Sequence, residues 1–327
     1  MKTRTGLNPY GLTYHLGLQA MGTPRANPAP AGLAGYLAVA AEIGARVVEL
    51  WDGWLAPMSD AELAALRERL AAAEMLPVIS SGLHNGDIDV CTRAARGLGA
   101  TLMRFALTPI LCGDRAAAGA RWPALVADVE GKLAAWAPRA ADAGLTILIE
   151  NHQDFTSAEL AAYCDRFGPA VRIVLDTANT FPTAEAPLDF VATVAPHVRY
   201  VHLKDYRVQV TTEGLRLVRC ATGDGCVPIR EIFDLLAGHH DEMVAAIEIG
   251  ALEARHVRLF TPGWWEGYPP RDAQSLARCL LAAQRNRLPD AADERTPWER
   301  GDDHLLAAWE LAQVRRSADN MRTLGLL

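Results

Sequence analysis

Four residues whose side chains bind metals or move protons stand at the ends of short apolar runs. Glu150 closes TILIE, Asp176 closes RIVLD, His202 closes RYVH and Glu248 closes VAAIE. The first two intervals are equal, since 176 − 150 and 202 − 176 are both 26, and the last is 46 (248 − 202). Even spacing at strand ends is typical of neighbouring strands in a repeated strand–helix unit. Because buried carboxylates need a partner or a metal, we predict a divalent-metal site with these four ligands.

Three carboxylates and one imidazole favour a particular class of ion and of reaction. Hard oxygen donors with a single nitrogen suit Mn²⁺, which is the expected ion, with Mg²⁺ and Co²⁺ as alternatives. The open coordination positions would take two vicinal oxygens of a hydroxy-carbonyl substrate, which points to isomerisation or epimerisation of a ketose or keto-sugar through an enediolate. If the strand order holds, Glu150 and Glu248 lie on opposite sides of that substrate and form an acid/base pair.

The elements that must position these residues alternate regularly between strands and helices. The strand segments are apolar throughout, as expected of parallel strands buried on both faces. We predict a (β/α)₈ barrel over residues 1–288, with its active site at the C-terminal strand ends. A doubly wound open sheet is the alternative, but the Gly-rich loop that would follow its first strand is missing. The predicted strands are 10–18, 45–51, 76–84, 100–106, 145–151, 171–176, 198–204 and 243–249.

Two features outside the strands complete the predicted architecture. Ser59 with Glu62 three residues later is a capping box that starts a helix. Residues 289–327 form a polar connector and a terminal helix, which we expect to pack on the barrel or on a neighbouring subunit. The run GWWEGYPPR at 263–271 is predicted to be a lid or a subunit contact, because exposed paired tryptophans are unfavourable in a monomer.

Composition limits the classes of partner. The chain has 327 residues, a formal net charge of −7 and a pI near 5.7, which argues against a nucleic-acid-binding surface. No apolar stretch reaches about 18 residues, so we expect no membrane span, and the first residues lack the apolar region of a secretory signal. Six scattered cysteines without a CxxC pair indicate reduced thiols in a cytoplasmic protein. The expected partners are a carbohydrate substrate and further copies of the chain, as a homo-oligomer.

Further polar residues near the strand ends are candidates for substrate binding. A buried arginine such as Arg104 needs an anionic partner, either a protein carboxylate or a substrate carboxylate or phosphate. Lys204 shares the inward face of His202, and Trp51 is a candidate apolar wall for a sugar ring. His15 is interpreted as a substrate contact or a wall residue, and His84 as a pocket residue or a loop residue without a role. The complete set of substrate-binding candidates is His15, Glu49, Trp51, His84, Arg104, Asn179, Lys204 and Arg219.

The strings around the four predicted ligands resemble a known family. IENHQD, VLDTAN, VHLKD and IEIG look like the sugar isomerase/epimerase family with the xylose-isomerase-like TIM barrel, which includes epimerases, isomerases, dehydratases and abasic-site endonucleases. The resemblance is strongest over about 145–250 and extends over about 10–286. It implies the ligands Glu150, Asp176, His202 and Glu248, and it implies that both glutamates also transfer protons.

Two positions depart from this resemblance. Epimerases of the family usually carry a histidine three residues after the ligand aspartate, where this chain has Asn179. Conversely, His152 lies two residues beyond Glu150 and so on the same face of the strand. His152 is either a general base beside the metal or a residue that orients Glu150. The first interpretation favours a lyase on a keto-sugar or keto-sugar acid, such as a decarboxylase, dehydratase or C-glycoside deglycosidase.

Two other functional classes remain as alternatives. An abasic-site endonuclease would need several more metal-binding histidines and a basic groove, and the absence of such histidine clusters and the acidic balance of the chain argue against it. A barrel without metal, serving only for binding or structure, would leave the four aligned residues without an explanation.

Overall fold

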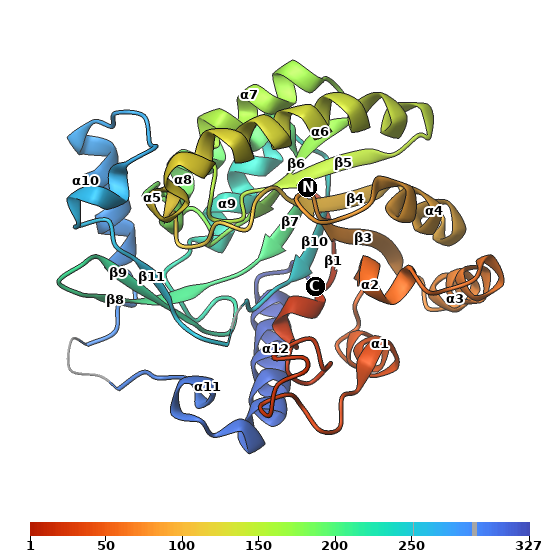
Figure 1. The fold of residues 1–327 in the computed structure, drawn as a ribbon. Helices are drawn as coiled ribbons and strands as arrows, with labels where there is room; N and C mark the ends of the chain where they lie inside the picture. The colour runs from red at the N-terminus through yellow and green to blue at the C-terminus, as the bar shows by residue number, and fades with distance from the viewer. Residues whose placement is uncertain (251, 290–292) are drawn as a thin grey trace.

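Eight parallel strands close into a barrel surrounded by helices in a computed structural model of the chain, which describes residues 1–250, 252–289 and 293–327 (Figure 1). The order around the barrel is β1-β10-β7-β6-β5-β4-β3-β2. The predicted (β/α)₈ barrel is therefore confirmed. Its strands are β1 (Lys2–Leu7), β2 (Val47–Trp51), β3 (Leu76–Gly82), β4 (Leu102–Ala106), β5 (Thr146–Glu150), β6 (Val171–Asp176), β7 (Val198–Leu203) and β10 (Glu242–Ile247).

The first strand is not where the sequence pattern placed it. The prediction for residues 10–18 was wrong, because β1 lies at Lys2–Leu7 and pairs with β10 and β2. Only its last three residues are buried, so its polar beginning hid the apolar signal. Gly6 lets β1 approach β2, since a Cβ there would lie 1.7 Å from the Val47 carbonyl oxygen. The apolar side chains of 10–18 are instead buried in a loop that packs under helices.

Helices connect the barrel strands and cover the outside of the barrel. The predicted capping box is present at Ser59 and Glu62, and Thr156 forms a second one with Glu159. The helices up to the last barrel strand are α1 (Gly32–Glu42), α2 (Asp52–Leu55), α3 (Asp60–Ala72), α4 (Ile88–Leu98), α5 (Arg115–Ala118), α6 (Trp122–Asp142), α7 (Ser157–Phe167), α8 (Pro187–Val194) and α9 (Ile229–Ala237).

A small antiparallel sheet stands beside the barrel where long loops were expected. It consists of β8 (Tyr206–Val210), β9 (Leu215–Arg219) and β11 (Arg255–Val257), in the order β11-β9-β8 (Figure 1). Charged residues interrupt the apolar pattern of these short strands, which explains why the sequence pattern did not identify them. Arg219, expected in a loop, is the last residue of β9.

The C-terminal region returns to the barrel. After α10 (Ala273–Ala283) come α11 (Pro297–Arg300) and α12 (Leu306–Thr323), and α12 lies beside the N-terminal loop (Figure 1). Arg315 of α12 forms an ion pair with Glu42 of α1. Among the described residues, no helix combines the length and the apolar character needed to cross a membrane.

The aromatic run at 263–271 packs against the same chain. Trp264 is only 3% exposed, and its indole N–H donates to the Cys112 carbonyl oxygen at 3.0 Å. The Tyr268 hydroxyl donates to the Gly113 carbonyl oxygen at 2.9 Å. Burial against the loop after β4 therefore accounts for the paired tryptophans, which the sequence analysis had taken to be exposed.

Candidate metal centre

The four predicted ligands meet at the C-terminal end of the barrel. Glu150 and Asp176 end β5 and β6, His202 lies in β7, and Glu248 follows β10. Their ligand atoms all lie within 4.8 Å of one another, and all four side chains are buried. We call these residues the four-residue cluster. Adjacent strands hold them in register, with Asp176 opposite His202 and His202 opposite Ala246.

A fourth carboxylate, outside the cluster, fixes the orientation of the His202 ring. His202 Nε2 lies 2.7 Å from Glu49 Oε2, while Nδ1 lies 3.1 Å from Glu150 Oε1 and 3.0 Å from Glu248 Oε2. Donation from Nε2–H to Glu49 leaves the Nδ1 lone pair directed toward the cluster, the arrangement in which histidine binds metals. Glu49 was predicted to contact sugar hydroxyls. In the structure it is fully buried behind His202 and acts on that ring instead.

Two permanent cations hold the carboxylates of the cluster in place. Arg104 of β4 forms an ion pair with Glu150, so of the two anionic partners considered for this arginine the structure contains the protein carboxylate. Lys204 Nζ lies 3.1 Å from Asp176 Oδ2 and 3.0 Å from Glu248 Oε1. These contacts orient three of the four ligands before any substrate arrives.

The charges in and around the cluster do not balance. Four carboxylates face two permanent cations, which leaves an excess of two negative charges in a buried place. An excess of this kind is unfavourable unless a bound cation neutralises it. A divalent ion, with His202 neutral, would balance the set, so the residues present fit a divalent metal. The buried groups counted are Glu49, Glu150, Asp176, Glu248, Arg104 and Lys204.

The pKa values of the ligands reflect the same competition between burial and neighbouring charges. Burial raises the pKa of Asp176 to about 6, although Lys204 opposes the change. Burial also acts to raise the pKa of Glu150, but Arg104 and His202 outweigh it and hold that pKa at about 2. For His202, burial is outweighed by Glu49 and the ligand carboxylates, and its pKa is raised well above the usual value. Without a cation in the cluster, a proton on His202 takes up part of the excess charge.

Asn179 is occupied by contacts within the protein. Its amide Nδ2 donates to Asp176 Oδ2 at 2.6 Å, and its Oδ1 accepts from Gln153 Nε2 at 3.2 Å. Asp176 Oδ1 also accepts from the backbone N–H groups of Ala178 and Asn179. The structure therefore places Asn179 where it orients a ligand carboxylate, whereas the sequence analysis considered it for a sugar hydroxyl.

A cavity of about 520 Å³ opens above the cluster and collects half of the predicted substrate-binding residues. Trp51, His84, Arg104, Lys204, His152 and Glu248 line this cavity, which we call the barrel mouth. The other four candidates lie elsewhere. Glu49 and Asn179 contact His202 and Asp176 from positions outside the lining of the cavity. His15 faces α1, where a Cβ at Gly35 would lie 3.8 Å from His15 Nε2, and Arg219 lines a different cavity. Sequence reasoning did not select several other residues of the barrel mouth: Tyr10, Thr13, Gln19, Asp52, Ser81, Asn85, Gln153, Glu253 and Arg255.

The sequence pattern did not identify these residues, for reasons that the structure shows. Tyr10, whose ring centroid lies 5.5 Å from the Arg104 guanidinium, was assigned to a strand that does not exist. Glu253 and Arg255 form an ion pair at 3.0 Å beside β11, an element that the pattern did not reveal. Asp52 begins α2 directly after Trp51. Its position just beyond a strand end was a usable signal.

His152 lies at the barrel mouth as its spacing predicted. Its Nδ1 is buried and has no hydrogen-bond partner among the described residues. Burial lowers the pKa of His152 to about 4, so the ring is neutral at pH 7. A neutral imidazole nitrogen without a partner, in a cavity beside the cluster, is a free hydrogen-bonding and proton-accepting group.

Comparisons with known proteins agree with this fold. The family model described as the xylose isomerase-like TIM barrel matches residues 37–278. A curated relative, the uncharacterized protein YihM of Escherichia coli (strain K12), is 34% identical over 92 residues, and the match spans 28% of this chain and 28% of that protein.

Solved structures with little sequence identity have the same fold. D-psicose 3-epimerase in the presence of D-fructose superposes with a TM-score of 0.58 at 16% identity, covering 99% of this chain and 100% of that one. A xylose isomerase-like TIM barrel protein from Mycobacterium smegmatis in complex with magnesium superposes with a TM-score of 0.57 at 18% identity, covering 86% and 97%. With its family model matched over most of its length, this chain belongs to the xylose isomerase-like TIM barrel family.

Proposed function

We propose that the protein is a divalent-metal-dependent isomerase or epimerase of a ketose or keto-sugar, acting through an enediolate. The observation that carries this proposal is the four-residue cluster, which is buried below the barrel mouth. Together with its neighbouring charged groups it has an excess of two negative charges. A divalent ion bound there would polarise a ketone carbonyl and stabilise the negative charge that develops when the adjacent C–H loses its proton. Mn²⁺ is the proposed ion, with Mg²⁺ and Co²⁺ as alternatives, because oxygen donors dominate the cluster.

The proton carriers in this proposal are the acid/base groups that reach the cavity. Glu248 lines the barrel mouth and accepts contacts from Lys204 and His202, so it is placed to move a proton from the β10 side. Glu150 was expected to serve the other side, but it is fully buried and paired with Arg104. His152, two residues further along the chain, lines the cavity and is the group within reach from the β5 side. Glu150 then acts chiefly as a ligand.

The barrel mouth suits a small polar substrate. Its volume of about 520 Å³ lies within the range of ordinary small-molecule sites. Trp51 offers an apolar face, while His84 and Asn85 offer hydrogen-bonding groups. A monosaccharide with several hydroxyl groups matches this mixed lining, and the proposed substrate is therefore a small carbohydrate.

Deuterium exchange tests the reaction class. Purified protein loaded with Mn²⁺ would be incubated with a panel of ketoses and keto-sugar acids in D₂O and followed by NMR. We expect deuterium to appear at the carbon next to the carbonyl without loss of any fragment. Glu253→Gln, which removes a carboxylate of the same cavity outside the cluster, serves as a control and should show the same exchange. Absence of exchange for every substrate, in protein with a full complement of metal, would contradict the proposal.

A lyase acting on a keto-sugar or keto-sugar acid is the second candidate, favoured by His152. Its unpartnered Nδ1 at the barrel mouth is an acid/base group that can serve a departing group instead of the second face of a ketose. In the same incubations a lyase would release water, carbon dioxide or an aglycone, and His152→Ala would abolish the release while deuterium exchange persisted. Release that is unaffected in His152→Ala would remove the reason for this candidate.

We also propose that the protein assembles as a homo-oligomer. The support is apolar surface on neighbouring helices, since Leu281 of α10 is 72% exposed and Leu188 of α8 is 37% exposed. Light scattering on the purified protein tests this, with Leu281→Glu expected to shift the population toward monomer. A monomer at micromolar concentration would contradict it.

A further inference from the structure

The C-terminal helix α12 contributes a buried carboxylate next to the barrel mouth. Glu310 is fully buried. Its Oε2 accepts from the His15 backbone N–H at 2.8 Å, and its Oε1 accepts from the Tyr14 backbone N–H at 3.2 Å and from the Thr13 hydroxyl at 3.4 Å. The loop that follows β1 is thus fixed by a residue almost three hundred positions away in sequence.

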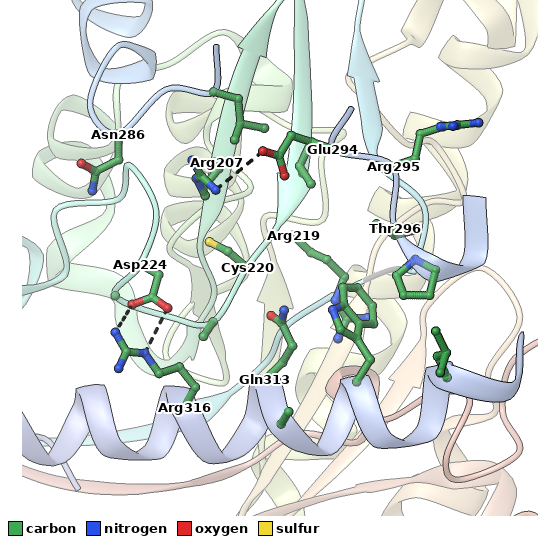
Figure 2. A pocket seen from close by; sticks show the side chains of 18 of the residues that line it. Arg207, Arg219, Cys220, Asp224, Asn286, Glu294, Arg295, Thr296, Gln313 and Arg316 are labelled. Carbon is green, nitrogen blue, oxygen red and sulfur yellow. Dashed lines mark hydrogen bonds and ion pairs between the residues drawn. The ribbon is translucent and has the colours of Figure 1, made fainter. Parts of the chain in front are cut away.

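Arg219 of β9 connects the same loop to the loop after β10. Its guanidinium donates to the Gly250 carbonyl at 3.0 Å and to the Gly11 carbonyl at 3.3 Å. It also lies 3.9 Å from Glu310 Oε1 and 4.5 Å from the centre of the Trp309 ring. Figure 2 shows Arg219 between β9 and α12. Arg219 is 3% exposed, so this charge is held inside the protein.

The two loops held in this way build the barrel mouth. Tyr10 and Thr13 come from the first loop, while Glu248 and Gly250 come from the second. Gly250 touches Lys204 so closely that a Cβ added at Gly250 would lie 2.5 Å from Lys204 Cε. The position of the Gly250 backbone therefore limits where Lys204 can lie, and Lys204 in turn contacts two carboxylates of the four-residue cluster.

The attachment of α12 to the barrel does not by itself explain why Glu310 and Arg219 are buried. Other residues of α12 already attach it to the barrel through surface contacts, such as Arg315 with Glu42 and Arg316 with Asp224. Burying a carboxylate and a guanidinium is less favourable than burying apolar side chains of the same size. Buried charges are therefore expected where their directional contacts are needed. The contacts made here end on backbone groups of the two loops that carry substrate-binding and metal-binding residues.

We propose that Glu310 and Arg219 are a positioning pair, through which the C-terminal helix sets the geometry of the barrel mouth and of the metal ligand Glu248. The proposal rests on the proposed function only in taking the four-residue cluster as a metal site. Neither residue lines the barrel mouth. Arg219 was first considered as a substrate-binding residue, and the structure assigns it this supporting role instead.

Metal affinity, measured apart from stability, tests the proposal. Glu310→Gln would be compared with wild type for Mn²⁺ binding by calorimetry, for thermal unfolding, and for hydrogen exchange of the amides of residues 13–15. We expect Mn²⁺ affinity to fall about fivefold, less than the loss of tens of fold that is typical when a direct partner of a ligand is removed. Exchange at Tyr14 and His15 should accelerate. Arg316→Ala, which removes a surface contact of the same helix, is the matched control and should change neither quantity.

A double variant separates positioning from stability. Arg219→Met with Glu310→Gln removes both buried charges, so no unpaired charge remains and folding should recover relative to either single variant. We expect Mn²⁺ affinity to remain low in the double variant, because the Gly250 carbonyl then lacks its donor, Arg219. Wild-type Mn²⁺ affinity in both the single and the double variant would overturn the proposal. If wild-type protein itself binds no divalent ion, the proposed function fails, whereas unchanged amide exchange at 13–15 in Glu310→Gln would refute the positioning role separately.

Discussion

The barrel mouth and a larger cavity beside the antiparallel sheet differ in how their charges are arranged. The barrel mouth has about 520 Å³, whereas a second cavity of about 1120 Å³ lies between β8, β9, the segment before α11, and α12. We call the second one the extension cavity (Figure 2). In it, Arg316 pairs with Asp224 at 3.0 Å, Arg207 lies 4.0 Å from Glu294, and the guanidinium groups remain largely in contact with water.

The difference shows that unbalanced buried charge marks the functional cavity better than volume does. Apart from the buried Arg219, the arginines of the extension cavity meet acids at the surface, where ion pairs contribute little and need no ligand. Below the barrel mouth, carboxylates outnumber permanent cations in a fully buried place. Only the second arrangement stays unfavourable until a cation binds.

The largest expected effect comes from removing a carboxylate of the cluster. Glu248→Gln should reduce turnover by a factor of about 10²–10⁴, the usual contribution of a positioned acid or base, and should also weaken metal binding. Steady-state kinetics and metal analysis on the same preparation measure the two effects. Glu253→Gln, at the rim of the same cavity, should keep both close to wild type. Equal losses of turnover and metal binding in the two variants would mean that any carboxylate of the cavity, and not only those of the cluster, is required.

Breaking the buried pair between Arg104 and Glu150 should chiefly affect stability. Arg104→Met leaves Glu150 buried without its cation, which we expect to lower the free energy of unfolding by about 3–5 kcal/mol. Urea denaturation in the presence of chelator measures this change. Arg166→Met is a suitable control, because its ion pair with Glu130 is on the surface. A loss in Arg104→Met no larger than in the control would show that the pair is not desolvated as described.

Metal removal tests the charge argument directly. At a free Mn²⁺ concentration about 100 times its dissociation constant, wild-type protein should gain about 2.7 kcal/mol of stability over the chelated protein. Asp176→Asn should abolish most of that gain, because it removes one of the four ligands. Thermal unfolding with and without chelator provides the measurement. Equal stabilisation of wild type and Asp176→Asn would place the ion elsewhere.

The smallest effect is expected in the extension cavity. Asp224→Asn removes the partner of Arg316 at the surface and should leave the melting temperature, Mn²⁺ affinity and turnover unchanged. Isothermal calorimetry with Mn²⁺ and a thermal melt are sufficient to check it. A clear loss of metal affinity would contradict the comparison, since it would couple the surface ion pairs of the extension cavity to the metal site.

Much of the barrel was predictable because parallel strands bury both faces. Runs such as TILIE and RIVLD therefore indicate strands directly, and the structure contains them as β5 and β6. The pattern failed at β1, whose first half is polar and exposed, and at the β8–β9–β11 sheet, whose strands are short and charged. At β1, pairing with β10, which is distant in sequence, compensates for a weak local signal. In the small sheet, β8 and β9 pair as neighbours in sequence, and β11 joins β9.

The sequence by itself determined the metal ligands of the candidate site. In parallel strands of one barrel, residues at the strand ends come together whatever the details of packing, so Glu150, Asp176, His202 and Glu248 were identifiable from their positions. Only the tertiary structure decided which other side chains hold these ligands in position. The contacts of His202 with Glu49, Glu150 with Arg104, and the barrel-mouth loop with Glu310 join residues between about fifty and three hundred positions apart. No local pattern records such pairings, because they depend on how the closed barrel and the returning helix bring distant side chains together.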